Sequence, residues 1–145
     1  MRAPIYRCEL VRDETTKVPE ICTTPAKSAA LFREFIGPGA DKEHFVMAAL
    51  DAQNRVIGLS LVSLGTLTAS LVHPREVYKP ALLLNAAAVI VCHNHPSGDP
   101  AASPEDREAT RRLVRAGDLL GVPLVDHVIL GEGETFFSFR DKGLL

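Results

Sequence analysis

The residues of this chain best suited to chemistry lie between His93 and Asp106. Two histidines, His93 and His95, flank a single asparagine and follow the apolar run 87–92. Because residues two apart in an extended strand point to the same face, both imidazoles can reach one ion. Imidazole nitrogens are common zinc ligands, so this spacing predicts a zinc site at the carboxyl end of a strand.

A third ligand is predicted at the start of the next helix. Apolar residues recur at three- and four-residue steps after Ser103, so we expect Ser103 to be the N-cap and Pro104 the first helical residue. Asp106 then lies in the first turn, where its carboxylate can reach the histidines. Ser-x-x-Asp alone would indicate only a helix cap, and His-x-His alone is a weak metal signal. Their combination favours zinc with three protein ligands, His93, His95 and Asp106, and one open position, as catalytic zinc requires.

The motif from His93 through Pro96, with Ser103 and Asp106 at this spacing, resembles the JAMM (MPN-plus) metallopeptidase motif of RadC-like proteins. The resemblance covers roughly residues 43–143. Further RadC-like segments are 43–45, 50–51, 54–57, 65–67, 72–77, 85–88 and 126–131. The resemblance implies an α/β fold with a mixed β-sheet flanked by helices, the cytidine-deaminase-like sandwich of JAMM/MPN domains.

The resemblance also implies catalytic roles for two residues. Glu43 matches the glutamate that JAMM enzymes place on a separate strand, where it accepts a proton from the attacking water; from the sequence alone it would be a solvated residue in a polar stretch. Ser103 matches the hydroxyl donor that stabilises the oxyanion. The predicted activity is zinc-dependent hydrolysis of a peptide or isopeptide bond, with a protein or peptide as substrate.

Two features qualify the resemblance. Asn94 stands where JAMM isopeptidases outside the RadC group commonly carry Ser or Thr, and we expect its side chain to point away from the metal. The first forty residues show no match to the helix-hairpin-helix module that usually precedes RadC domains. Asp126 or His127 could offer a fourth ligand or orient a metal-binding imidazole. Adjacent strand residues face opposite ways, so we expect at most one of the two near the site, and a structural hydrogen bond is favoured there.

An alternative function, a non-catalytic accessory role in DNA repair or recombination, comes from the historical association of RadC-like proteins. The net charge of −2 gives no general attraction to phosphate backbones. The arginines of the segment 107–115 are interrupted by acidic residues, which favours a solvated helix face. The sequence therefore carries no strong nucleic-acid signature.

The composition is that of a compact enzyme. The 145 residues suit a single structural domain. No apolar stretch approaches the roughly 20 residues of a membrane span, and we expect a soluble, cytoplasmic protein. The three cysteines, Cys8, Cys22 and Cys92, are odd in number and lack a Cys-x-x-Cys spacing, so we expect reduced thiols, with Cys92 facing away from His93.

The elements that must position these residues follow from periodicity. We expect an N-terminal part, 1–42, with a strand and a helix packing on the core, and a catalytic part, 43–145. Pro80 lies inside an expected helix and predicts a kink or a late helix start. The expected strands are 5–11, two strands flanking the turn 51–54, 67–72, the histidine strand, 122–130 and 135–139; the expected helices are 25–36, 74–86 and the one that Ser103 caps.

Overall fold

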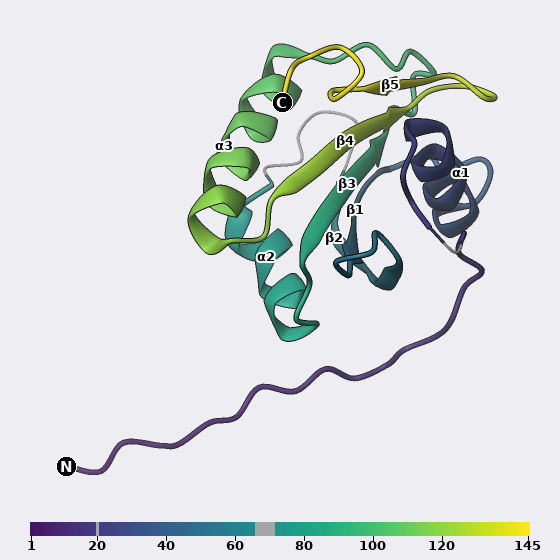
Figure 1. Ribbon diagram of the computed structural model, residues 1–145. Helices are drawn as coiled ribbons and strands as arrows, with labels where there is room; N and C mark the ends of the chain where they lie inside the picture. Colours follow the sequence, from purple (N-terminus) through teal and green to yellow (C-terminus); the bar gives the residue numbers. More distant parts are fainter. Residues whose placement is uncertain (20, 66–71) are drawn as a thin grey trace.

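The computed structural model of the chain describes residues 1–19, 21–65 and 72–145. Figure 1 shows the elements in space. In the described residues the elements are, in order, α1 (Pro25–Ile36), β1 (Glu43–Leu50), β2 (Val56–Gly65), α2 (Pro74–Leu83), β3 (Ala88–Asn94), α3 (Pro104–Leu120), β4 (Leu124–Leu130) and β5 (Phe136–Ser138).

The strands form one mixed sheet in the order β2-β1-β3-β4-β5. The β1–β2 and β4–β5 hairpins are antiparallel, and β1 also pairs antiparallel with β3. By contrast, β3 and β4 are parallel, because α3 carries the chain back across the sheet between them. The predicted α/β fold with a mixed sheet flanked by helices is confirmed.

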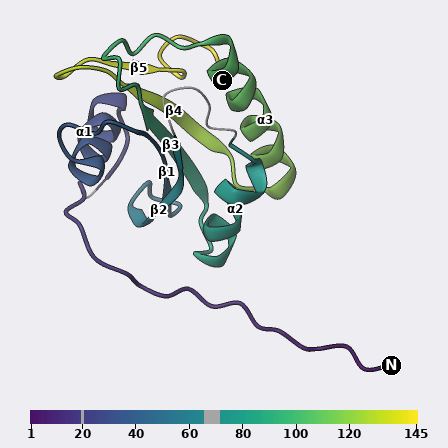
Figure 2. The same ribbon diagram turned by 180° about the vertical axis from the view of Figure 1, so that it is seen from behind.

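Helices cover both faces of the sheet, as Figures 1 and 2 show from opposite sides. On one face, α1 buries Leu31 and Phe32 against apolar side chains of β1, β3 and β4. On the other face, α2 and α3 bury Val77, Tyr78 and Leu113 against the alternate residues of the same strands. The central strand β3 is buried along its whole length, which explains its almost continuous apolar sequence.

The alternation of β3 decides which layer each of its last residues enters. Cys92 belongs to the core beneath α1, whereas Val91 belongs to the core beneath α2 and α3. His93 therefore points toward the α2 and α3 layer, and Cys92 faces away from it, as predicted. All three cysteines are free thiols, with Cys22 and Cys92 buried.

Helix α2 runs through Pro80 without interruption, from Pro74 to Leu83. The late start that Pro80 predicted is therefore wrong. Proline removes one backbone hydrogen bond, but Val77, Tyr78 and Ala81 are fully packed on the sheet, and this burial holds the helix together.

The strand predicted at residues 5–11 is not formed. In this segment Ile5 and Tyr6 expose 98% and 84% of their surface, and Figure 1 shows the chain running away from the core. Alternating side chains specify a strand only when another strand supplies the hydrogen bonds, and within the described residues none lies beside this segment. The predicted strand 67–72 falls mainly on residues 66–71, outside the described residues. No helix in the described part of the chain has the length and apolar character to cross a membrane.

Candidate metal centre

Four side chains from three elements meet at the carboxyl end of β3. They are Glu43 at the start of β1, His93 in β3, His95 just beyond β3, and Asp106 in α3, and one donor atom of each lies within 4.8 Å of all the others. The structure thus brings together the three predicted metal ligands and the predicted general base. Their roles at a metal stay predictions.

The spacing of the donors suits a tetrahedral ion. The His93 Nε2 atom lies 3.0 Å from His95 Nε2 and 3.1 Å from Asp106 Oδ1, and His95 Nε2 lies 3.2 Å from Asp106 Oδ2. Ligands about 2.0–2.1 Å from a tetrahedral zinc lie about 3.3 Å apart, so these three donors could bind one ion with little movement. Glu43 Oε1 lies farther out, 3.8 Å from His93 Nε2, which suits a group that acts on a water.

Asp106 is positioned by the cap of its own helix. Ser103 and Asp106 form a capping box, in which Asp106 N–H donates to Ser103 Oγ and Ser103 N–H donates to Asp106 Oδ2, each over 3.0 Å. The predicted N-cap at Ser103 and the first helical residue at Pro104 are confirmed. Asp106 can therefore be both a helix cap and a metal ligand, because its carboxylate caps the helix and faces both histidines.

Glu43 reaches the site through the pairing of β1 with β3. Phe45 pairs with His93 in this antiparallel register, so Glu43 lies beside the position of His95. Asn94 fastens the two strand ends together: its Oδ1 accepts from His44 N–H over 2.7 Å, and its Nδ2 donates to Lys42 O over 3.0 Å. Asn94 thus bonds the backbone on both sides of Glu43 with its two amide atoms, in line with the prediction that it points away from the metal.

His95 is oriented by the loop that follows it. The His95 Nδ1 atom lies 2.7 Å from the carbonyl oxygen of Asp99, which can only accept, so Nδ1 carries a proton and Nε2 faces the site. The hydrogen bond with Asp106 raises the pKa of His95, against the opposing effect of burial. Burial raises the pKa of Asp106, but the neighbouring His93 and His95 imidazoles outweigh it and hold that pKa well below its usual range. Asp106 is therefore an anion at neutral pH.

A second layer of polar side chains lies behind His93. The His93 Nδ1 atom is 2.7 Å from Nε2 of His127, whose Nδ1 is in turn 2.7 Å from Oγ1 of Thr110 in α3. Burial, followed by the field of His93, lowers the pKa of His127 well below the ordinary value, so His127 is neutral. Asp126 instead accepts from Ser138 Oγ over 2.7 Å on the other face of β4, so only one of this pair lies near the site, as predicted.

Sequence analysis missed the roles of Thr110 and Asn94 in this arrangement. Thr110 lies four residues after Asp106, one turn along the same helix face, and this spacing is the only signal that could have found it. The strand-clamping role of Asn94 depends on the register of β1 against β3, which its sequence neighbours do not specify.

Comparison with known proteins agrees with this geometry. Residues 22–144 match the RadC-like JAB domain family. The chain belongs to this family. The predicted resemblance is thereby confirmed, and it extends over α1 as well as over the segment 43–143.

The names of its relatives, UPF0758 proteins, state no function. The RadC-like chain is 57% identical over 103 residues to UPF0758 protein STH371 of Symbiobacterium thermophilum, covering 71% of this chain and 44% of the relative. It is 47% identical over 125 residues to a UPF0758 protein of Rubrobacter xylanophilus, covering 86% and 54%. A UPF0758 protein of Trichlorobacter lovleyi is 50% identical over 123 residues, with 85% and 53% covered. The chain thus spans about half the length of the curated relatives it matches.

Proposed function

We propose that this RadC-like domain is a zinc-dependent metallohydrolase that cleaves a peptide or isopeptide bond. The observation that carries the proposal is the convergence of two imidazoles and one carboxylate at 3.0–3.2 Å, with a second carboxylate 3.8 Å from His93. A structural zinc would require a fourth close ligand, whereas this arrangement leaves one corner for a substrate or a water.

The chemistry divides between the ion and the protein. Zinc, when bound, lowers the pKa of a coordinated water toward about 7. Glu43 accepts the proton of the attacking water and returns it to the leaving amine, a role that its partly buried carboxylate can fill across the short distance to the centre. Ser103 Oγ accepts a hydrogen bond in the helix cap, which leaves its own O–H to donate to the carbonyl oxygen as charge develops there.

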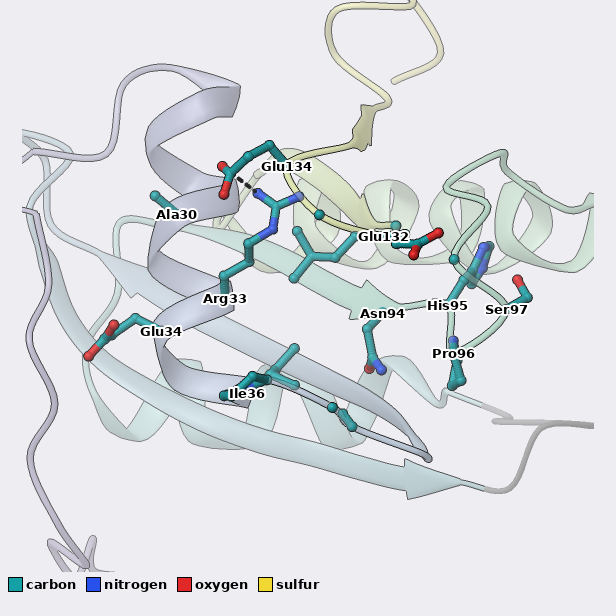
Figure 3. Close-up of a pocket in the computed structure, with 18 residues that line it drawn as sticks. Ala30, Arg33, Glu34, Ile36, Asn94, His95, Pro96, Ser97, Glu132 and Glu134 are labelled. Atoms are coloured by element: carbon teal, nitrogen blue, oxygen red, sulfur yellow. Dashed lines mark ion pairs between the residues drawn. The ribbon is translucent and has the colours of Figure 1, made fainter.

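We propose a polypeptide as the substrate, because a groove on the α1 side of the sheet ends beside the centre, with His95 the one of the four donors among its lining residues. Figure 3 shows this groove between the carboxyl half of α1 and the β4–β5 hairpin, with the loop of His95 and Ser97 at one end. Its volume is about 780 Å³, which is large enough for several residues of an extended chain. The Arg33 guanidinium lies 3.8 Å from Glu134 Oε2 and donates to Thr135 O over 2.6 Å, so it joins α1 to the β4–β5 hairpin across the groove.

The test compares Glu43→Gln with His95→Ala. We expect Glu43→Gln to retain zinc but to lower kcat by about 10²–10⁴, because the proton acceptor is lost while the three ligands remain. We expect His95→Ala to lose both zinc and turnover. Zinc is measured by elemental analysis, and cleavage with a library of fluorogenic peptides and lysine-isopeptide conjugates.

Glu105→Gln is the matched control, since Glu105 is an exposed glutamate in the first turn of α3. It should bind zinc and cleave like the wild type. Normal turnover in Glu43→Gln would remove Glu43 from the mechanism, and a wild-type protein that binds no zinc would refute the proposal. A salt-dependent DNA affinity that survives zinc removal, in a protein without hydrolase activity, would favour the accessory role instead.

A further inference from the structure

We propose that His127 and Thr110 are positioning residues that fix the proton of His93 on Nδ1, so that the Nε2 lone pair faces the metal centre. The proposal deepens the zinc site put forward above and rests on it for its consequence. Its geometry, however, is a property of the protein chain alone.

Three short contacts link His93 to helix α3 in an unbroken series. His93 Nδ1 lies 2.7 Å from His127 Nε2, and His127 Nδ1 lies 2.7 Å from Thr110 Oγ1. Thr110 Oγ1 lies 2.7 Å from the backbone oxygen of Asp106. The series therefore begins on one predicted ligand and ends on the backbone of another.

The direction of every hydrogen bond in this series follows from its last member. The carbonyl oxygen of Asp106 can only accept, so the single hydroxyl proton of Thr110 is donated to it. Thr110 Oγ1 must then accept from His127 Nδ1–H. A neutral His127 with its proton on Nδ1 has a lone pair on Nε2, and this lone pair accepts from His93 Nδ1–H. His93 Nε2 is thus the nitrogen that remains to bind an ion.

Burial makes this arrangement costly to disturb. His93, Thr110 and His127 expose 1%, 1% and 0% of their surface, so a polar atom that loses its partner has no bulk water to replace it. The rings are also enclosed: Phe139 stacks on His127 with centroids 4.8 Å apart, and Phe45 stacks on His93 at 5.8 Å. Each imidazole thus packs face to face with an aromatic ring inside the core.

The pairing of β4 with β3 explains why His127 comes from β4. Val91 of β3 pairs with His127 of β4 in the parallel register, so His127 lies two residues before the position opposite His93, on the same face of the sheet. This face is the one that α3 covers. A histidine here can therefore bridge the ligand-bearing strand and the ligand-bearing helix.

The first test reads the proton positions in metal-free protein by long-range ¹H–¹⁵N NMR of the imidazoles. We expect wild-type His127 to carry its proton on Nδ1. In Thr110→Val, which keeps the shape but removes the hydroxyl, we expect His127 to populate both tautomers, and in Thr110→Ser we expect the wild-type pattern. A wild-type His127 protonated on Nε2 would overturn the proposal, whatever the protein does with zinc.

The second test measures zinc affinity by competition with a chelator. We expect Thr110→Val to bind zinc about 10–100-fold more weakly and Thr110→Ser to bind like the wild type. Ser28→Ala is the control, because Ser28 is an equally buried hydroxyl in α1 on the opposite face of the sheet. Its zinc affinity should not change. Equal affinity of Thr110→Val and wild type would overturn the positioning role, whereas a wild type that binds no zinc would refute the proposed function and leave the NMR result to decide this one.

Discussion

Protonation at single residues sets how the centre responds to pH. The hydrogen bond with Asp106 raises the pKa of His95 above its ordinary value of 6.5, while Asp106 itself stays ionised. A raised histidine pKa means that, without metal, the folded state holds the proton more tightly than the unfolded chain does. A zinc ion, in contrast, requires the unprotonated imidazole, so proton and metal compete for His95.

We therefore expect opposite pH trends for the two forms of the protein. Without metal, the stability that protonated His95 contributes is fully present below pH 6.5 and is lost as pH rises through the raised pKa. With zinc, stabilisation should grow with pH, by up to about 1.4 kcal/mol per pH unit for each proton displaced. Thermal unfolding between about pH 5 and pH 8, with zinc or with a chelator, measures both trends. If stability changed with pH in the same way with zinc and with chelator, the competition between proton and zinc for His95 would be contradicted. Asp106→Asn should make the stability of the metal-free protein depend less on pH.

At the scale of elements, close packing between α2 and α3 holds the ligand-bearing helix on the sheet. Tyr78 of α2 donates a hydrogen bond to Leu113 O over 2.9 Å, and Gly117 of α3 lies against the same hydroxyl. A Cβ atom at Gly117 would lie 2.6 Å from Val122 O and closer still to the Tyr78 hydroxyl. This approach is possible only because residue 117 has no side chain.

Gly117→Ala should accordingly destabilise the fold. Overpacking typically costs about 1–3 kcal/mol, which exceeds the gain of about 1 kcal/mol that alanine brings to a helix interior. Urea unfolding measures the change. The double variant Gly117→Ala with Tyr78→Phe lacks the hydroxyl and should regain part of the lost stability. The recovery should be incomplete, because the clash with Val122 O remains. A Gly117→Ala protein as stable as wild type would show that the two helices can separate at no cost.

The sequence predicted elements better than it predicted contacts between them. Helix α1, the capped start of α3 and the β1–β2 hairpin carry local signals, such as Thr24 before Pro25 and the turn 51–54, and the structure confirms them. The segment 5–11 carries the same kind of signal, but a strand also needs a partner, which local residues do not specify. The link from His127 to His93 was only one possibility in the sequence, because it depends on the register of two strands separated by a helix.

At the scale of the whole molecule, the fold and the centre depend on each other, whereas the first residues take part in neither. The three predicted ligands come from β3, the loop after β3, and α3, so an ion would tie the central strand of the sheet to one of the helices that cover it. Within the described residues, the one ion pair of the segment 1–16 joins Arg7 to Glu9, two residues of that same segment. Stability should therefore respond to zinc and not to this segment.

Removing residues 1–16 should change the free energy of unfolding by less than about 0.5 kcal/mol, because no core side chain is lost. Zinc at 100 times its Kd should, in contrast, raise it by about 2.7 kcal/mol. Differential scanning fluorimetry of the full and shortened chains, with and without zinc, measures both effects. A large loss on shortening would mean that the segment packs somewhere in solution, and the oligomeric state of the full chain would then be measured.

The capping box of α3 has a consequence for anyone who wishes to transplant this centre into another scaffold. Asp106 Oδ2 accepts from Ser103 N–H while Oδ1 faces His93, so the angle of the carboxylate is fixed by where the helix begins. Grafting the histidines and an aspartate onto a new backbone would transfer the ligand atoms but not the orientation of the carboxylate. The smallest portable unit is the loop end, the serine and the first helical turn, moved as one piece.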